Sequence, residues 1–334
     1  MAYEPALGAY FDPDPAARKY PGGRWSEQEV TEAQAQLDEL AAVLQHRGII
    51  VQRPEPFPAT GAFATPDFAV PFGNSYACPR DVLLTVGDTV IEAPMAQRGR
   101  FFEYRGYRQI LSRHFEEGGR WLVAPKPLLA DTSFAPDYTT REHAYDMKRH
   151  PVLRTNDPCF DAASFTRCGR DIFWQPDMVS NHQGATWLQR ALGPEFRVHK
   201  VEFRDRYPQH IDTTLVPLRP GLAMVNPERP PKPGELSLFE KSGWRLITPP
   251  ASVRAGLPAP ARDVSNWIAT NVLVIDPETV VVEQAEDPLA EMLGRNGFEV
   301  VRVAFDKVYK FGGGFHCCTA DLRRDGSLKS YFEA

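Results

Sequence analysis

An approximate internal repeat constrains the fold of this 334-residue chain more than any other feature of its sequence. Two short apolar runs joined by a turn are followed by a helical pattern and then by a third apolar run, and this order occurs four times. The four hairpin-like stretches cover residues 82–94, 161–174, 213–225 and 271–283. Each repeat therefore reads as a ββαβ unit, and we expect one small sheet and one helix from each.

A fifth unit can be assembled only from the two ends of the chain. Residues 315–332 read as a terminal hairpin that supplies two strands, and residues 26–53 read as a helix followed by a strand at 49–51. The start of this helix is clearly marked, because Ser26 is a preferred N-cap residue and Glu29 completes a capping box. The two ends together would supply one more blade.

Closure of the repeat by both termini is how propeller-like rings protect their edge strands. We therefore predict an α/β fold in which ββαβ units form a five-bladed propeller around a pseudo-five-fold axis, with residues 1–334 in a single domain. An open α/β sheet with helices on both faces is the alternative architecture for the same pattern.

Charge and hydropathy argue against several classes of partner. The formal net charge of −5 comes without a run of like charges, which argues against nucleic acid and against an anionic membrane surface. The first residues lack the features of a signal peptide, and no apolar run approaches the roughly 18 residues of a membrane span. Because five cysteines, an odd number, suit a reducing compartment, we predict a cytoplasmic protein with small-molecule or protein partners.

The positions just ahead of each hairpin carry reactive side chains. If the units are related by rotation, these positions converge on the central axis. Taken singly, such an aspartate is usually a turn residue, a lone histidine is usually a satisfied polar group, and a buried cysteine is usually inert packing. Their shared place in the repeat favours a site instead, and the candidates are Asp81, Asp161, His210, Asp212, Ser265, His316 and Cys317.

A thiol among carboxylates suggests a cationic substrate. A cysteine beside a histidine is the standard pairing for a nucleophile, but nearby carboxylates raise the pKa of a thiol unless a cation is bound. A guanidinium offers planar donors that carboxylates accept bidentately, so Asp81 and Asp212 could hold it against Cys317. The glycines at 312–314 would let the backbone approach the ligand closely. A metal site fits poorly, because the adjacent Cys317 and Cys318 lack C-x₂-C spacing.

At these residues the chain resembles the amidinotransferase family. The resemblance covers most of the chain through CPRDVLLTVGDTVIEAPM, RFFEYRGYR, APKPLLAD, PCFDAASF, GRDIF, HIDTTLVPLRPG, NPERP, NVLVID, GGGFHCCT and the C-terminal SY. It implies the five-bladed pentein fold and no cofactor or metal. It also implies a triad of Cys317, His210 and Asp161, with substrate binding by Asp81, Asp212, Arg229, Ser265 and His316.

The activity that the resemblance implies is a two-stage transfer. Cys317 takes the amidino group of L-arginine, ornithine leaves, and an acceptor amine then receives the group, in the biosynthesis of a guanidino metabolite. The resemblance also implies a homodimer. Tyr207 and Gln209 correspond to the acceptor entrance and do not match the glycine-specific members, and a valine replaces the first of the family's two serines beside Ser265.

Family members commonly begin with an extra strand that contains an N-x-W-D-P-like motif, whereas this sequence begins with MAYEPALGAYFDPDP, so either the fifth blade is built differently or the sequence is short at its N-terminus. Two other readings share the scaffold. In an arginine deiminase-like hydrolase, water would replace the acceptor amine. A non-catalytic pentein would be a binding ring, which leaves the reactive residues at the repeat positions without a purpose.

Overall fold

The computed structural model describes residues 26–55, 61–70, 73, 77–136, 151–205, 208–253 and 265–332. Four three-stranded sheets dominate this part of the chain, each with a helix between its second and third strands. They consist of β3 (Leu83–Val86), β4 (Thr89–Glu92), α4 (Arg108–Glu116) and β5 (Arg120–Val123); β6 (Phe165–Cys168), β7 (Asp171–Trp174), α5 (His182–Leu192) and β8 (Arg197–Lys200); β9 (Leu215–Arg219), β10 (Leu222–Val225), α6 (Ser237–Lys241) and β11 (Arg245–Ile247); β12 (Leu273–Asp276), β13 (Thr279–Glu283), α7 (Asp287–Arg295) and β14 (Glu299–Val303).

The four predicted ββαβ units are confirmed. In each unit the first two strands pair antiparallel as a hairpin, and the third strand returns parallel to the second after the helix. A parallel return requires such a crossover, which explains the place of the helix. The second strands β4, β7 and β13 are buried at every residue, as expected for strands covered on both faces.

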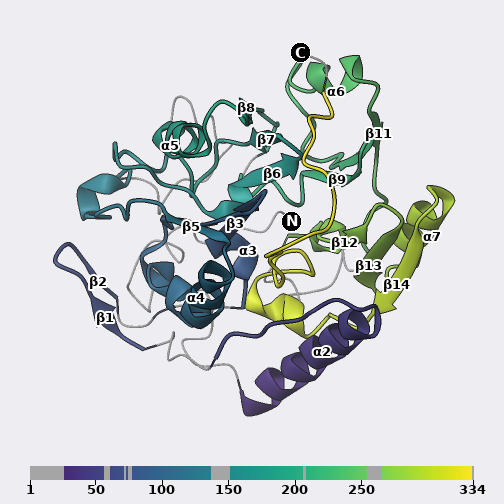
Figure 1. Cartoon of the computed structure of the whole chain (residues 1–334), viewed down its shortest axis with the longest axis horizontal. Coiled ribbons are helices and arrows are strands. Elements are labelled where there is room, and N and C mark those ends of the chain that lie inside the picture. The colour runs from purple at the N-terminus through teal and green to yellow at the C-terminus, as the bar shows by residue number, and fades with distance from the viewer. Residues whose placement is uncertain are drawn as a thin grey trace.

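Shorter elements lie before, within, between and after these units. They are β1 (Phe63–Ala64), β2 (Ala69–Val70), the one-turn helix α3 (Pro79–Val82) and the 3₁₀ helices η2 (Arg98–Arg100), η3 (Glu103–Tyr107), η4 (Asp131–Ser133), η5 (Ala162–Ser164), η6 (Ile268–Thr270) and η7 (Val308–Phe311). In Figure 1 the four sheets surround the middle of the molecule, with α5, α6 and α7 at its periphery. Among the described residues, no helix is both long enough and apolar enough to cross a membrane.

Neighbouring units share their apolar cores. Phe173 of β7 contacts Phe239 of α6 in the next unit, with ring centroids 4.6 Å apart. Met224 of β10 belongs to one buried cluster with Val280 and Leu293 of the fourth unit. Because each sheet buries its apolar surface partly against the next unit, the units hold one another in place.

The N-terminal helix α2 (Glu27–His46) starts where the sequence predicts. The amide of Glu29 donates to Ser26 Oγ at 3.2 Å, and Glu29 Oε2 accepts from the Ser26 amide at 3.0 Å, which confirms the capping box. The helix buries its apolar face against the fourth unit. The strand predicted at 49–51 is wrong, because Ile50 is 87% exposed and no other segment of the described residues pairs with this one.

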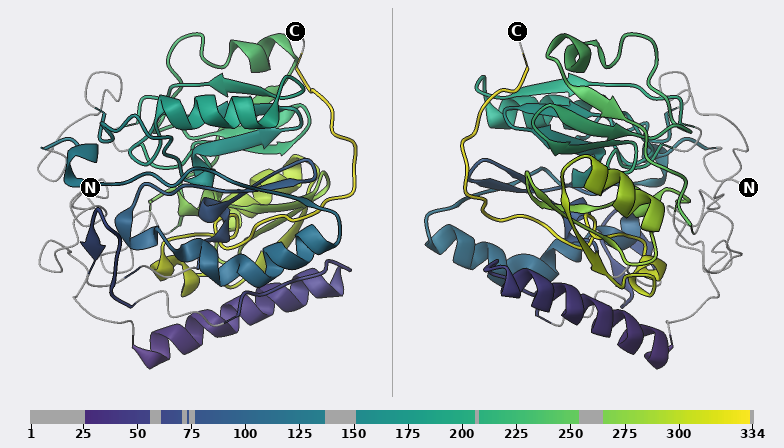
Figure 2. Two further views of the ribbon diagram at one scale, coloured as in Figure 1. Left: turned by 60° about the vertical axis from the view of Figure 1, so that its left-hand side comes forward. Right: turned by 90° about the vertical axis from the view of Figure 1, so that its right-hand side faces the viewer.

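The hairpin predicted at residues 315–332 is also wrong. Residues 315–318 form a buried turn, and the described residues after it run in extended form over the outside of the molecule, with no strand and only an isolated bridge between Ser330 and Gly169 (Figure 2). Its polar groups bond to side chains and backbone of the units rather than to a partner strand of its own. Besides the two-stranded sheet of β1 and β2, the described residues therefore contain four three-stranded sheets and no fifth sheet of that kind.

The C-terminal segment contacts all four units. Asp321 accepts from Arg80 and from Arg167, each at 2.9 Å, and so joins the first unit to the second. Arg324 donates to the carbonyl of Val274 in the fourth unit at 2.7 Å. Phe332 stacks on Trp244 in the third unit, with ring centroids 5.0 Å apart. One strap of chain thus ties the repeated units together.

Candidate active site

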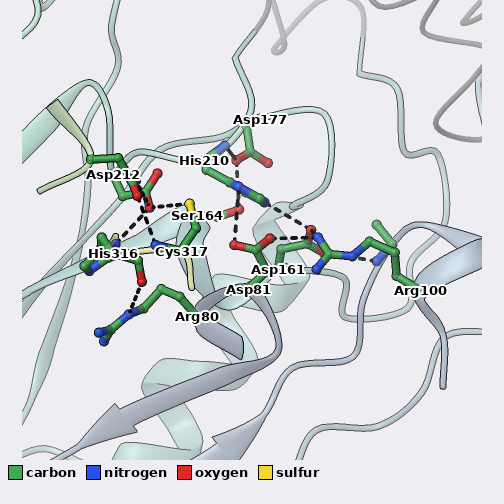
Figure 3. Close-up of polar contacts among 12 residues, drawn as sticks. Arg80, Asp81, Arg100, Asp161, Ser164, Asp177, His210, Asp212, His316 and Cys317 are labelled. Atoms are coloured by element: carbon green, nitrogen blue, oxygen red, sulfur yellow. Dashed lines mark hydrogen bonds and ion pairs between the residues drawn. The ribbon is translucent and has the colours of Figure 1, made fainter. Parts of the chain in front are cut away.

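Most of the candidate side chains come from the segments just ahead of the first strand of a unit, and Cys317 comes from the turn after the last unit. Asp81 lies in α3, which leads into β3, and Asp161 is the N-cap of η5, which leads into β6. His210 and Asp212 stand in the turn ahead of β9, and Cys317 follows η7. Although these residues are far apart in sequence, the structure brings all five together (Figure 3).

One half of the site is built around His210. Its Nε2 lies 3.1 Å from Asp161 Oδ2, and its Nδ1 lies 3.6 Å from Asp81 Oδ1. The backbone of His210 has a φ of 60°, a left-handed conformation that is uncommon for residues other than glycine. The buried carboxylate of Asp177 accepts the His210 amide at 2.9 Å and so supports this conformation.

The environment of His210 favours its charged form. Burial alone would lower the pKa of the imidazole, because it disfavours the charge. The negative charge of Asp81 and the hydrogen bond and charge of Asp161 outweigh burial and, with Asp212, raise the pKa of His210 to about 10. At neutral pH the residue is therefore an imidazolium that can donate a proton.

The other half of the site is built around Cys317. Its Sγ lies 3.5 Å from Asp212 Oδ2, and its amide donates to Asn271 Oδ1 at 3.0 Å. The Asn271 amide group also donates to Asp212 at 2.8 Å, as does His316 Nδ1 at 2.8 Å. Burial, then Asp212 and Asp81, raise the pKa of the Cys317 thiol well above its ordinary value, so the thiol is protonated when the site is empty.

The glycine-rich turn ahead of Cys317 is required by close packing. Gly312 has a φ of 99°, in the left-handed region that favours glycine. A Cβ added at Gly313 would lie 2.4 Å from the Cβ of Cys317, and one added at Gly314 would lie 2.8 Å from Asn271. The turn can therefore present Cys317 at this position only because these residues lack side chains.

The predicted carboxylate-binding pair also meets. Arg229 donates from Nη2 to Ser265 Oγ at 2.9 Å and from Nη1 to the hydroxyls of Thr213 and Thr214 at 2.9 and 3.1 Å. The Nε of Arg229 lies 3.3 Å from the Asp205 carboxylate, which balances part of the guanidinium charge, whereas the described partners of its two Nη atoms are neutral hydroxyls. This arrangement orients a cationic fork of the kind that binds a carboxylate.

The acceptor entrance is only partly described. Gln209 is half-buried and precedes His210 in the chain. Tyr207 lies outside the described residues. In the described part of the chain, no group of three or more His, Cys, Asp or Glu side chains is arranged to hold a metal ion.

Sequence reasoning missed several buried residues of this site. Arg100 contacts Asp81 and Asp161, and Asn271 joins Asp212 to Cys317. Their residue types gave no signal, because arginine and asparagine are common on surfaces. Asn271 does stand at the start of the fourth hairpin-like stretch, so the repeat position that revealed the aspartates could have revealed it too.

Comparison with known proteins gives a consistent picture. No family model matches the chain. The mitochondrial glycine amidinotransferase of Danio rerio is 40% identical over 324 residues, which are 95% of this chain and 75% of that protein. The L-arginine:L-lysine amidinotransferase of Pseudomonas savastanoi pv. phaseolicola is 39% identical over 333 residues, 99% of this chain and 88% of that protein.

A solved structure is similar over nearly the same extent. SxtG, an amidinotransferase from Microseira wollei in the saxitoxin biosynthetic pathway, superimposes with a TM-score of 0.85 at 38% sequence identity. The superposition covers 92% of this chain and 85% of the SxtG chain.

Proposed function

This chain belongs to the amidinotransferase family, and we propose that it transfers the amidino group of L-arginine to a primary amine through a covalent adduct on Cys317. One observation carries this proposal: a buried thiol and a His–Asp pair share a site with two further carboxylates, Asp81 and Asp212. These are the groups that a guanidinium-binding nucleophilic site needs.

The two carboxylates provide the binding site for the guanidinium. Oδ1 of Asp81 is buried and accepts no hydrogen bond from the described residues, although it lies 3.6 Å from His210 Nδ1. Asp212 lies beside the Cys317 sulfur. A planar guanidinium held between these carboxylates would present its central carbon to the thiol, while Arg229 and Ser265 would bind the α-carboxylate of arginine.

Binding of the substrate would activate the nucleophile. The carboxylates that raise the pKa of Cys317 in the empty site become neutralised when a guanidinium pairs with them. The thiol then releases its proton to solvent, because the bound cation favours the thiolate. Arginine would thus create the reactive form of the enzyme that attacks it.

In the first half-reaction, the thiolate of Cys317 adds to the guanidinium carbon to form a tetrahedral adduct. His210, an imidazolium at neutral pH, donates its proton to the side-chain nitrogen that carries the ornithine moiety. The carbon–nitrogen bond breaks, ornithine leaves, and an amidino group remains on the sulfur. Asp161 orients His210 and stabilises its charge throughout.

In the second half-reaction, the acceptor amine adds to the amidino carbon of the adduct. The neutral His210 takes a proton from the attacking nitrogen, and the carbon–sulfur bond breaks. The product leaves as a guanidino compound, and the site regains its thiolate and imidazolium. The relatives are named for glycine and L-lysine as acceptors, and the likeness to SxtG supports a role in making a guanidino-containing natural product.

Other parts of the proposal rest on the sequence. We propose that residues 1–334 form a single domain of the five-bladed pentein type, in which α2 and the C-terminal segment occupy the fifth position. The five unpaired cysteines support a reducing compartment such as the cytoplasm. A homodimer stays a prediction from the resemblance.

Intact mass after incubation with L-arginine tests the central step. The protein is incubated without an acceptor, quenched in acid and weighed, with Cys317→Ala as the control. We expect a mass increase of one amidino group in the parent protein and none in the variant. Citrulline without an adduct would indicate the hydrolase instead. The absence of both the adduct and citrulline would contradict the proposed chemistry.

A further inference from the structure

Arg100 is a buried arginine that the reaction scheme above does not use. It ends η2, its side chain is 7% exposed, and its Nη1 donates to Asp81 Oδ2 at 2.8 Å. The same Nη1 lies 3.6 Å from Asp161 Oδ2. Nε and Nη2 bind the carboxylate of Glu103 at 3.0 and 2.8 Å. One guanidinium therefore reaches both the carboxylate proposed to bind arginine and the carboxylate that orients His210.

The two oxygens of the Asp81 carboxylate have different partners, because Arg100 binds only one of them. Oδ2 is held by Arg100, whereas Oδ1 turns toward His210 and accepts no hydrogen bond from the described residues (Figure 3). With Oδ2 fixed, Oδ1 has only one direction in which to point. A free carboxylate would rotate between orientations and lose that direction.

The charge of Arg100 matters as much as its shape. Asp81, Asp161 and Glu103 are each at most 5% exposed, and three carboxylates this close repel one another when all are ionised. Without a nearby cation, this repulsion would push the three carboxylates apart. Asp81 would then no longer hold its Oδ1 in the direction that meets a substrate guanidinium.

We propose that Arg100 is a positioning residue for amidino transfer, which fixes Asp81 for the substrate guanidinium and keeps Asp161 aligned with His210. The inference rests on the proposed function. Glu103 in turn fixes Arg100 through its bidentate contact and touches neither His210 nor Cys317 in the described contacts.

Arg100 also affects the protonation of His210 through the groups it pairs. The charged groups facing His210 are Asp81 on α3, Asp161 ahead of η5, and Asp212 on its own turn, while Asp177 accepts its amide. Without Arg100, the carboxylates of Asp81 and Asp161 act on His210 with less compensation, so its pKa rises further. The neutral imidazole that deprotonates the acceptor then forms only at higher pH.

Two pairs of variants separate positioning from packing. Arg100→Lys keeps the charge but loses the fork, and Arg100→Met removes the charge. The matched controls are Arg98→Lys and Arg98→Met, because Arg98 lies in the same short helix, is similarly buried, and pairs instead with the exposed Asp131 and the Leu129 carbonyl. Thermal unfolding of all four variants is measured first, and Glu103→Gln supplies a milder change if Arg100→Met does not fold.

The kinetic measurement follows each half-reaction separately by intact mass. We expect Arg100→Lys to lower kcat/KM for adduct formation with L-arginine about 100-fold, because a small misplacement of reacting groups costs that much. Arg98→Lys should lower it by no more than about fivefold, as for other pairs with an exposed partner. In Arg100→Met, or in Glu103→Gln to a smaller extent, the acid limb of the acceptor half-reaction should move to higher pH, and in the Arg98 variants it should stay.

Two results would overturn this role. One is an Arg100→Lys variant with parent-like kinetics. The other is a uniform loss of activity in the Arg100 variants that the Arg98 variants share, with the pH limb unmoved, since that is the signature of packing alone. A parent protein that forms no adduct would instead contradict the proposed function and is recognised before any variant is compared.

Discussion

The two histidines of the site form similar hydrogen bonds but differ in charge, because one is a cation and the other is neutral. His210 lies 3.1 Å from a buried carboxylate oxygen of Asp161, and His316 lies 2.8 Å from one of Asp212. The pKa of His210 is nevertheless raised to about 10, whereas burial and the charge of Arg80 lower the pKa of His316 against the pull of Asp212. A hydrogen bond to a buried carboxylate thus does not by itself set the charge of an imidazole.

The other charged groups near each histidine explain why the two pKa values differ. His210 faces Asp81 in addition to Asp161, and both stabilise the imidazolium. His316 faces Arg80, whose Nε donates to the His316 carbonyl at 3.3 Å. One histidine can therefore donate a proton at neutral pH, while the other is a neutral donor that steadies Asp212 beside the nucleophile.

The largest expected difference between the histidines is in turnover. His210→Asn should lower kcat for ornithine release by roughly 10²–10⁴-fold, the usual contribution of a general acid. Asparagine is a suitable replacement because it tolerates the left-handed backbone at this position. His316→Asn should cost only about tenfold, because it removes one hydrogen bond to a charged group. Equal losses in the two variants would break the comparison.

The pH profile of the first half-reaction gives an independent reading of His210. Its proton is needed on the leaving nitrogen, so single-turnover adduct formation should keep its rate below the His210 pKa of about 10 and fall above it. His316→Asn should keep this basic limb. His210→Asn should lose it, and a limb that persists there belongs to another group.

The two substrate carboxylates should have similar effects on arginine binding but different effects on the pKa of Cys317. Asp81→Asn and Asp212→Asn should each weaken arginine binding by roughly 3–5 kcal/mol, because a buried guanidinium loses a charge partner. Calorimetry in the Cys317→Ala background measures this, with the exposed Asp131→Asn as the control. Asp212→Asn should also lower the pKa of Cys317 more than Asp81→Asn does, since Asp212 contributes more to raising it.

Alkylation of Cys317 as a function of pH tests the second part of this expectation. The rate should rise at lower pH in Asp212→Asn than in the parent protein. Peptide mapping is needed to separate Cys317 from the neighbouring Cys78 and Cys318. Unchanged alkylation together with intact arginine binding would remove Asp212 from the proposed site.

A smaller effect is expected on the pKa of His316, which should move toward that of His210 when the charge of Arg80 is removed. Arg80→Met removes the positive charge that lowers the pKa of His316, so this pKa should rise. Arg80→Lys keeps a charge nearby and is the control. NMR titration of the imidazole resonances distinguishes the two, and a His316 pKa that is equal in both variants would show that burial alone sets it.

The smallest expected effect is at the carboxylate end of the substrate site. Ser265→Ala removes one hydrogen bond from Arg229, which should weaken arginine binding by about 0.5–1.5 kcal/mol. Agmatine, which lacks the carboxylate, should bind both proteins alike. A loss of agmatine affinity in the variant would mean that Ser265 acts elsewhere.

The four repeated units could be read from the sequence because each depends on local patterns. Short apolar runs, turn residues and the capping box at Ser26 act within a few positions of one another. The fifth blade could not be read in this way. An apolar run such as 49–51 becomes a strand only if another segment pairs with it, and the described part of the chain supplies no such partner segment.

The same limit separates the found from the missed site residues. Asp81, Asp161, His210 and Asp212 stand just ahead of the first strand of a repeated unit, so the repeat pointed to them, whereas Cys317 was assigned to a fifth hairpin that the described residues do not form. Asn271 acts through partners 59 and 46 positions away, Asp212 and Cys317. Arg100 is defined by three carboxylates that only the folded chain brings together.

The extended C-terminal segment has a consequence for biosynthesis on the ribosome. The ribosome makes the chain from its N-terminus, at about 5–20 residues per second. Cys317 follows all four units in chain order, and the strap that ties the units together through Asp321 comes after it. The nascent chain can therefore contain Asp81, Asp161, His210 and Asp212 before it has a nucleophile, so the site has no thiol until Cys317 has been added.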